Sequence, residues 1–256
     1  MKNKFIPFTA LTSLLLIAGT IIINSCKKEQ IKINEPEVTE PQPLSFTEDF
    51  NHVGGLTAKG WAFKNNSYPV GSNGWRQGRY EAVSTPNYKF PDGFIGFPAY
   101  NATNSPNDFI SCDVSCVNFT GDISAWLITP PMTIKNGDVL EFYTRAPDDT
   151  NYPVYTRDRM QVLANITDGS ANVGTTPVSV GNFTTLLLDI NPGYVDNANG
   201  GYPFEEWTAY SITVSGLDNP VTNARIAFRY MGKNAGVDGP NYASIVGIDN
   251  LVFSSN

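Results

Sequence analysis

Two cysteines, Cys112 and Cys116, lie close together in the segment I-S-C-D-V-S-C, where paired thiols could form a disulfide or contribute to a metal site. Structural zinc takes four ligands, mostly Cys and His, and no histidine lies near this pair. Outside the cytoplasm, neighbouring cysteines are usually oxidised. We therefore expect a local disulfide that clamps a loop, provided that the chain is exported.

The single histidine, His52, precedes the pair Gly54 and Gly55. A hydrolytic triad needs a nucleophile, a base and an orienting acid, and no G-x-S-x-G segment accompanies this histidine. Phosphate-loop, dinucleotide-binding and zinc-protease motifs are also missing from the sequence. A glycosidase needs only two carboxylates, which are plentiful here. The sequence favours a non-enzyme, with a polysaccharide hydrolase as the weaker alternative.

The N-terminus has the layout of an export signal. Lys2 and Lys4 give a basic start, an apolar run follows over residues 5–23, and the small Ser25 precedes Cys26. This end resembles the lipobox of bacterial lipoproteins. It implies cleavage after residue 25 and lipid attachment at Cys26. An uncleaved membrane span is the alternative, because the run is near the minimum length that crosses a bilayer.

Lys27 follows the cysteine, where resembling lipoproteins that stay in the inner membrane carry Asp. We therefore expect an outer-membrane lipoprotein, anchored by several acyl chains and exposed at the cell surface. Residues 26–44 are polar, charged and rich in proline, which is typical of an extended linker. Residues 45–256 remain for one domain.

Charge excludes one class of partner. The chain has 17 basic and 24 acidic side chains, and removal of residues 1–25 takes away Lys2 and Lys4 but no acid, leaving 15 basic side chains and a net charge of −9. Nucleic-acid binding depends largely on clustered Lys and Arg, so we expect no nucleic-acid partner.

Alternating apolar residues predict strands. Leu140, Phe142 and Thr144 share one strand face, and Ile226, Phe228 and Tyr230 share another. Other strands are expected at 45–50, 75–83, 94–99, 124–134, 159–167, 184–190, 206–215 and 244–254. Turn segments at 136–138, 168–170 and 216–220 separate strands. This pattern predicts an all-β, two-sheet antiparallel jelly-roll sandwich. We expect the four tryptophans to lie in its core: Trp61, Trp75, Trp126 and Trp207.

Several segments together resemble choice-of-anchor J domains, which are related to cleaved-adhesin, MAM and galactose-binding-like jelly rolls. These segments are F-T-E-D-F-N at 46–51, G-W at 60–61, A-W-L-I-T-P-P-M-T-I at 125–134, D-V-L-E-F-Y at 138–143, W-T-A-Y-S-I-T-V at 207–214, A-R-I-A-F-R-Y at 224–230 and V-G-I-D-N-L-V-F at 246–253. The resemblance covers nearly all of residues 45–256. The insert that holds Cys112 and Cys116 is not part of the family pattern.

The resemblance also implies a structural calcium ion that joins the first strand to the last. The matching oxygen ligands are Glu48 or Asp49, with Asp249 near the C-terminus. Asn51 could add a neutral oxygen, although the family often has Glu there, so the site would carry less charge. The alternative is that Asp249 caps a turn and Glu48 is solvated.

Loop tyrosines are the expected ligand-binding residues, because loops carry recognition on β scaffolds. They are Tyr152, Tyr155, Tyr194 and Tyr202. The resulting hypothesis is a non-catalytic adhesion or glycan-binding module that binds a glycan or a host or matrix protein. A structural component of an outer-membrane assembly is the alternative.

Overall fold

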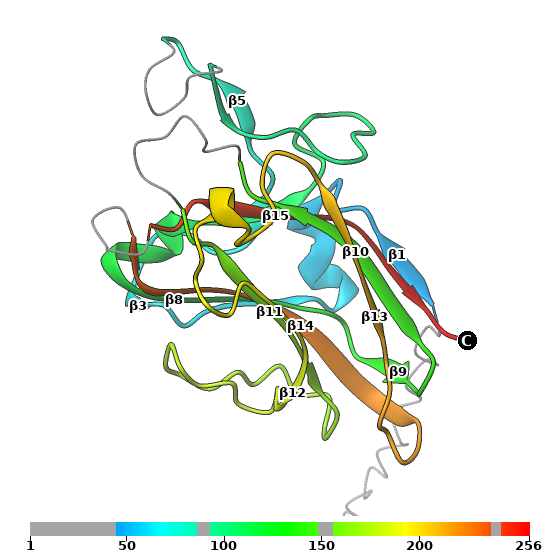
Figure 1. Ribbon diagram of the computed structural model, residues 1–256. Helices are drawn as coiled ribbons and strands as arrows, with labels where there is room; N and C mark the ends of the chain where they lie inside the picture. The colour runs from blue at the N-terminus through cyan, green and yellow to red at the C-terminus, as the bar shows by residue number, and fades with distance from the viewer. Residues whose placement is uncertain (1–44, 86–92, 148–155, 237–241) are drawn as a thin grey trace, which may run out of the picture. The chain divides into compact units, whose positions relative to one another are not determined.

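The computed structural model describes residues 45–85, 93–147, 156–236 and 242–256. These residues belong to one compact unit, which folds as a two-sheet antiparallel jelly-roll sandwich, as the sequence predicts. Figure 1 shows β1, β10, β13 and β15 in one layer, and β8, β11 and β14 in the other. Among the described residues, no helix has the length and apolar character needed to cross a membrane.

The first sheet has β15 near its centre and carries both ends of the domain. Its strands follow the order β13 (Thr208–Thr213), β10 (Val139–Arg145), β15 (Ile245–Ser254), β7 (Ile110–Asp113) and β4 (Arg76–Gln77), with β1 (Phe46–Glu48) also paired to β15. Glu48 lies opposite Leu251 in the β1–β15 register. The first and last strands of the domain are therefore neighbours, as the resemblance implies.

The second sheet is built around the long strand β14. Its order is β12 (Thr185–Ile190), β11 (Arg159–Asn165), β14 (Val221–Gly236), β8 (Val117–Ile128) and β2 (Ala62–Asn65), with β3 (Tyr68–Val70) paired to β8 and β9 (Met132–Ile134) paired to β14. All pairings in both sheets are antiparallel.

Short elements lie between the strands of the two main sheets. β5 (Tyr80–Ala82) and β6 (Phe94–Gly96) form a separate two-stranded sheet. The 3-10 helices of the described chain are η1 (Val53–Lys59), η2 (Val114–Cys116) and η3 (Asn197–Asn199). η2 directly links β7 of the first sheet to β8 of the second.

The core lies between the inner faces that the alternation predicts. Leu140 and Phe142 are fully buried, and the rings of Phe142 and Phe228 meet edge to face with centroids 5.0 Å apart. Trp61, Trp75 and Trp126 are buried, which confirms three of the four tryptophan predictions. Trp207 is only partly buried and packs against the smaller cluster of Phe97 and Phe109.

Strand periodicity locates most strands but misses three at the edges and at the layer junction. β2, β3 and β7 have no counterpart among the expected strands, and the expected strand at 75–83 is divided into β4 and β5. Trp126 is buried on the outer face of its sheet, where Phe183 and Val173 cover it. The loop that contains Phe183 thus adds a second apolar layer that strand periodicity does not reveal.

Candidate functional site

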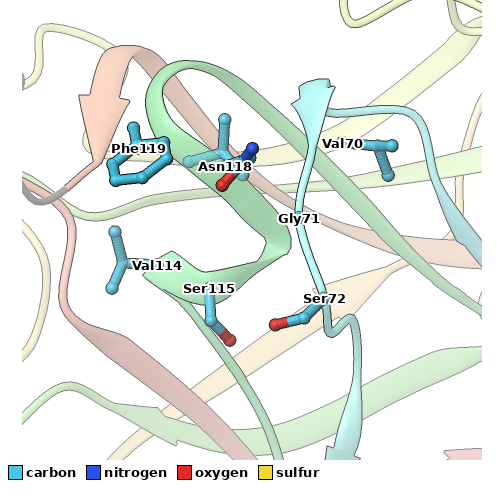
Figure 2. A pocket seen from close by; sticks show the side chains of 8 residues that line it. Val70, Gly71, Ser72, Val114, Ser115, Asn118 and Phe119 are labelled. Carbon is cyan, nitrogen blue, oxygen red and sulfur yellow. The ribbon is translucent and has the colours of Figure 1, made fainter.

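A surface hollow of about 490 Å³ opens where β3 lies beside η2 and the start of β8. It is lined by Val70, Gly71, Ser72, Val114, Ser115, Val117, Asn118 and Phe119. Figure 2 shows Val70, Gly71 and Ser72 on one chain segment, and Val114, Ser115, Asn118 and Phe119 on the segment that faces it. We call this feature the β3–β8 hollow.

A close backbone approach shapes the hollow. The Gly71 N–H donates to the carbonyl oxygen of Cys116 at 2.9 Å, and the Asn73 N–H donates to that of Ser115 at 3.3 Å. A Cβ atom at position 71 would lie 2.1 Å from the Ser115 carbonyl oxygen. Only glycine lets these two segments come so close, because it has no Cβ.

Polar side chains fix the turn beneath the hollow. Asp113 caps η2 by accepting the Ser115 N–H at 2.9 Å, and it forms an ion pair with Arg76. The Ser115 hydroxyl accepts a hydrogen bond from the Asn73 side chain at 2.8 Å. Side-chain hydrogen bonds thus join η2 to the loop after β3, and the two sides of the hollow are held in fixed positions.

Two large apolar side chains in the lining of the hollow are in contact with solvent. Val70 is 61% exposed and Phe119 is 70% exposed. Phe119 also has a φ of 60°, in the left-handed region that costs a non-glycine residue roughly 1–2 kcal/mol. Exposed apolar clusters mark binding surfaces, and backbone strain often accumulates at functional sites. This arrangement suits a ligand with flat apolar faces and polar edges.

The two internal cysteines lie directly beneath this surface. Both are fully buried free thiols in the structure, and a side-chain hydrogen bond joins Cys112 to Cys116. Burial, followed by the contact with Cys116, raises the pKa of Cys112 well above its usual value. The structure therefore brings the two side chains together, and the disulfide stays a prediction.

Of the two acidic residues expected for calcium near β1, Glu48 has other partners. Its side chain is paired with Lys59 Nζ at 3.0 Å and accepts the Phe50 N–H at 3.1 Å. Both carboxylate oxygens are therefore engaged. Glu48 is neither free to bind a cation nor solvated, since it is 6% exposed.

Asp249 is close enough to Asp49 for their charges to interact. Asp249 is fully buried, and its carboxylate accepts the N–H groups of Tyr100 at 2.9 Å, Asn101 at 3.2 Å and Asn250 at 2.7 Å. Burial raises the pKa of Asp249 to about 6, while these amides act to lower it and the charge of Asp49 raises it further. No basic side chain of the described residues is shown paired with either carboxylate.

Asn51 completes this cluster. Its Nδ2 donates to Asp49 Oδ2 at 2.7 Å and lies 3.4 Å from Thr103 Oγ1, while its Oδ1 is buried and has no hydrogen-bond partner. No group of three or more His, Cys, Asp or Glu is arranged to hold a metal among the described residues. Two uncompensated carboxylates and an unpartnered amide oxygen nevertheless fit the oxygen ligands that calcium prefers.

The tyrosine predictions have different outcomes. Tyr202 is wrong as a binding residue, because it is 1% exposed and its hydroxyl is hydrogen-bonded to Thr144 Oγ1 at 2.5 Å. Tyr194 is half-buried beneath the Arg159 guanidinium, which lies 5.1 Å from its ring centroid. Tyr152, Tyr155 and the lipidation residue Cys26 lie outside the described residues, so their roles stay predictions.

Sequence reasoning misses the β3–β8 hollow. β3 is a three-residue strand that contains a proline, so it shows no alternation, and Phe119 lies in the polar segment V-N-F-T-G. The one available signal is the presence of large apolar residues outside any apolar pattern. Only the pairing of β3 with β8 brings Val70 and Phe119 to one hollow.

Comparisons with known proteins show only distant likeness. No family model matches the chain, and no curated protein matches it. Among solved structures, the K1 cleaved adhesin domain of Lys-gingipain from Porphyromonas gingivalis W83 is 16% identical, with a TM-score of 0.47, covering 83% of this chain and 98% of that one. The K3 domain of the same protein is 20% identical, with a TM-score of 0.46 and coverages of 82% and 98%.

A third similar structure is TmCBM61 in complex with β-1,4-galactotriose, which is 9% identical with a TM-score of 0.36, covering 82% of this chain and 99% of that one. With TM-scores below 0.5, these likenesses do not decide the function of this chain. Membership of the choice-of-anchor J family stays a prediction.

Proposed function

We propose that this chain is a non-catalytic binding module that recognises a glycan at the β3–β8 hollow. The observation that carries the proposal is the exposure of Val70 and Phe119 in the lining of a hollow whose two sides are joined by backbone hydrogen bonds. A solvated aromatic side chain held in a left-handed conformation costs stability, and ligand binding gives a reason to retain it.

The chemistry of the surface favours a sugar over a purely apolar ligand. The C–H groups of a sugar ring can stack on the negative face of an aromatic ring, and Phe119 in the lining is more than two-thirds exposed. Asn118 and Ser72 in the lining provide an amide and a hydroxyl for sugar hydroxyls. Apolar walls with a few polar groups are the usual composition of a ligand site.

The proposed setting is the outer surface of a bacterial cell. It depends on the lipobox-like N-terminus, in which Cys26 would carry the lipid and residues 26–44 would form the tether. A tether of this kind would hold the sandwich away from the membrane and leave the hollow accessible. Radiolabelled fatty acid supplied to expressing cells should label the wild type but not Cys26→Ser, and labelling of both would exclude this anchor.

A glycan array probed with the full-length protein in mild detergent tests the function. We expect binding to one glycan class, with about a tenfold loss of affinity in Phe119→Ala, since truncation of a central aromatic contact residue costs more than about 1 kcal/mol and about 1.4 kcal/mol is tenfold. Val178→Ala is the matched control, because Val178 is an 81% exposed apolar residue outside the hollow lining.

Two other results would redirect the proposal. Binding that is unchanged in Phe119→Ala would keep a binding function but remove the hollow as its site. A blank array would overturn glycan binding and favour a host or matrix protein, or an assembly role in an outer-membrane complex. Slow hydrolysis of a bound polysaccharide would instead support the hydrolase alternative.

Calcium is the proposed structural ion of this module, with Asp49, Asn51 and Asp249 as its ligands. The supporting observations are the like charges of the two carboxylates and the buried, unpartnered Asn51 Oδ1. A cation bound there would offset the charge of the cluster and tie the end of β1 to β15. Because such an ion binds only the folded chain, it should raise thermal stability.

A further inference from the structure

The wall of the β3–β8 hollow is held in place by the carbonyl groups of η2. Cys116 O accepts the Gly71 N–H at 2.9 Å and Asn65 Nδ2 at 2.8 Å, and Ser115 O accepts the Asn73 N–H at 3.3 Å. The backbone positions of Ser115 and Cys116 therefore determine where the wall at residues 70–73 lies. A shift of η2 would move or release this wall.

The side chain of Cys116 reaches toward a rigid part of the fold. It contacts the thiol of Cys112, which lies in β7 and is paired in register with Val246 of β15. Cys112 thus belongs to the first sheet, and Cys116 ends η2, directly before β8 of the second sheet. A covalent bond between the two sulfur atoms would attach η2 to a strand with partners on both sides, β15 and β4.

We propose that Cys112 and Cys116 form a disulfide that fixes η2 against β7 and so holds residues 70–73 in the ligand-binding position. The oxidising setting rests on the proposed export of the chain, and the effect on ligand binding rests on the proposed function. The bond itself and the ordering of the wall can be tested without any ligand. Cys112 and Cys116 are positioning residues here, since neither lines the hollow.

The bond would form by thiol–disulfide exchange with an oxidised donor, either a protein or a small molecule. One cysteine thiolate attacks the donor disulfide, which creates a mixed disulfide and releases the first donor thiolate. The second cysteine then attacks the mixed disulfide, forms the Cys112–Cys116 bond and releases the second donor thiol. The two cysteines lose two protons and two electrons, and the donor gains both.

Burial fixes when this exchange takes place. Both sulfur side chains are inaccessible in the folded chain, so a bulky donor can reach them only before the domain closes or during local opening. For the same reason, a bond once formed is shielded from external reductant. The disulfide is accordingly expected to be a permanent part of the exported protein and not a switch.

The first test asks whether the bond exists. Full-length protein purified from the envelope without reductant is denatured in an excess of an alkylating agent and digested, and peptides with Cys112 and Cys116 are analysed by mass spectrometry. We expect both residues unlabelled and the peptide lighter by two hydrogens, with both labelled only after reduction. Alkylation of both without reduction would overturn the proposal.

The second test measures the wall by amide hydrogen exchange. In Cys112→Ala/Cys116→Ala, and in reduced wild type, the amides of Gly71 and Asn73 should exchange about tenfold faster than in oxidised protein. The matched control is the Asn66 amide, which is bonded to Ser124 O at 2.9 Å and not to η2, and which should be unchanged. Equal rates at Gly71 and Asn73 in all forms would refute the positioning role.

Ligand binding is measured last on the same samples. A lower affinity in the reduced and double-alanine forms, alongside faster exchange of the wall, is the expected result. Faster exchange in a protein that binds no glycan would preserve the disulfide and its structural effect while the proposed function fails. Unchanged affinity despite a loosened wall would show that the disulfide does not serve ligand binding.

Discussion

Replacement of Asp249 by asparagine should stabilise the calcium-free protein at neutral pH, although most changes of a buried carboxylate weaken a fold. Burial and the nearby charge of Asp49 raise the pKa of Asp249 from 3.8 to about 6. The folded chain therefore holds the proton more tightly than the unfolded chain does. The protonated Asp249 carboxyl group contributes fully to stability below about pH 4, and this contribution is lost as the pH rises through about 6.

The magnitude follows from the size of this shift. About two pKa units correspond to roughly 3 kcal/mol of cost for the ionised form, at about 1.4 kcal/mol per unit. The asparagine side chain would be neutral at every pH, but its amide group would replace one acceptor oxygen and leave a backbone N–H without its partner, at roughly 1–2 kcal/mol. The net gain for Asp249→Asn is then about 1–2 kcal/mol, or a few degrees in Tm.

Urea unfolding and thermal melts in the presence of a chelator, at about pH 4 and about pH 7.5, measure this effect. Wild type should lose stability between these two pH values at this site, and the variant should not. Asp189→Asn is the control of opposite sign. Burial acts to raise the pKa of Asp189, but hydrogen bonds from Arg159 and Gln161 outweigh it and lower the pKa, so this variant should be less stable at neutral pH.

Calcium adds the decisive comparison. Millimolar calcium should raise the Tm of wild type and have much less effect on Asp249→Asn, because a ligand bound only by the folded state stabilises it. The charge argument would be refuted if, in the presence of a chelator at neutral pH, Asp249→Asn were less stable than wild type. An equal calcium response in both proteins would place any ion elsewhere.

Two further predictions concern the hollow. Phe119→Gly should be about 1 kcal/mol more stable than Phe119→Ala in urea unfolding, because alanine keeps the backbone strain of a φ of 60° and glycine does not. The opposite order, with the alanine variant more stable, would show that the backbone at this position is not strained. Gly71→Ala should lose about 1–3 kcal/mol, because the new Cβ would meet the Ser115 carbonyl oxygen. Gly74→Ala, whose Cβ would meet nothing closer than 3.9 Å, should be nearly neutral, and similar losses in both variants would contradict the steric argument.

The interior of the sandwich can be predicted from the sequence because a strand that is buried on one face alternates apolar and polar residues. Leu140 and Phe142 are inward as the alternation indicates, and so are Ile226, Phe228 and Tyr230. Alternation does not predict burial where a sheet face is covered by something other than the opposite sheet. Ala227 and Arg229 alternate with these residues, yet both are buried, because the loop that carries Phe183 packs over the outer face.

The candidate sites are less predictable because they depend on contacts between distant segments. Asp49 and Asp249 are suggested only through a family resemblance, and the role of Asn101 as a donor to Asp249 has no sequence signal. Tyr202 follows Gly200 and Gly201, a context that is typical of a surface loop. The sequence does not show that its hydroxyl meets Thr144 in the interior.

Buried carboxylates are common in this fold, and their partners separate structural ones from the proposed ion ligand. Asp158 accepts hydrogen bonds from Tyr230, Ser244 and Asn197, and Asp138 has Lys135 Nζ at 3.6 Å. These polar and basic partners account for the burial of both carboxylates. In the part of the chain that the structure describes, Asp249 is hydrogen-bonded to backbone amides and lies near a second carboxylate, and burial together with the charge of Asp49 raises its pKa. If calcium binds there as proposed, it would offset the charge of this cluster and would link β1 to β15.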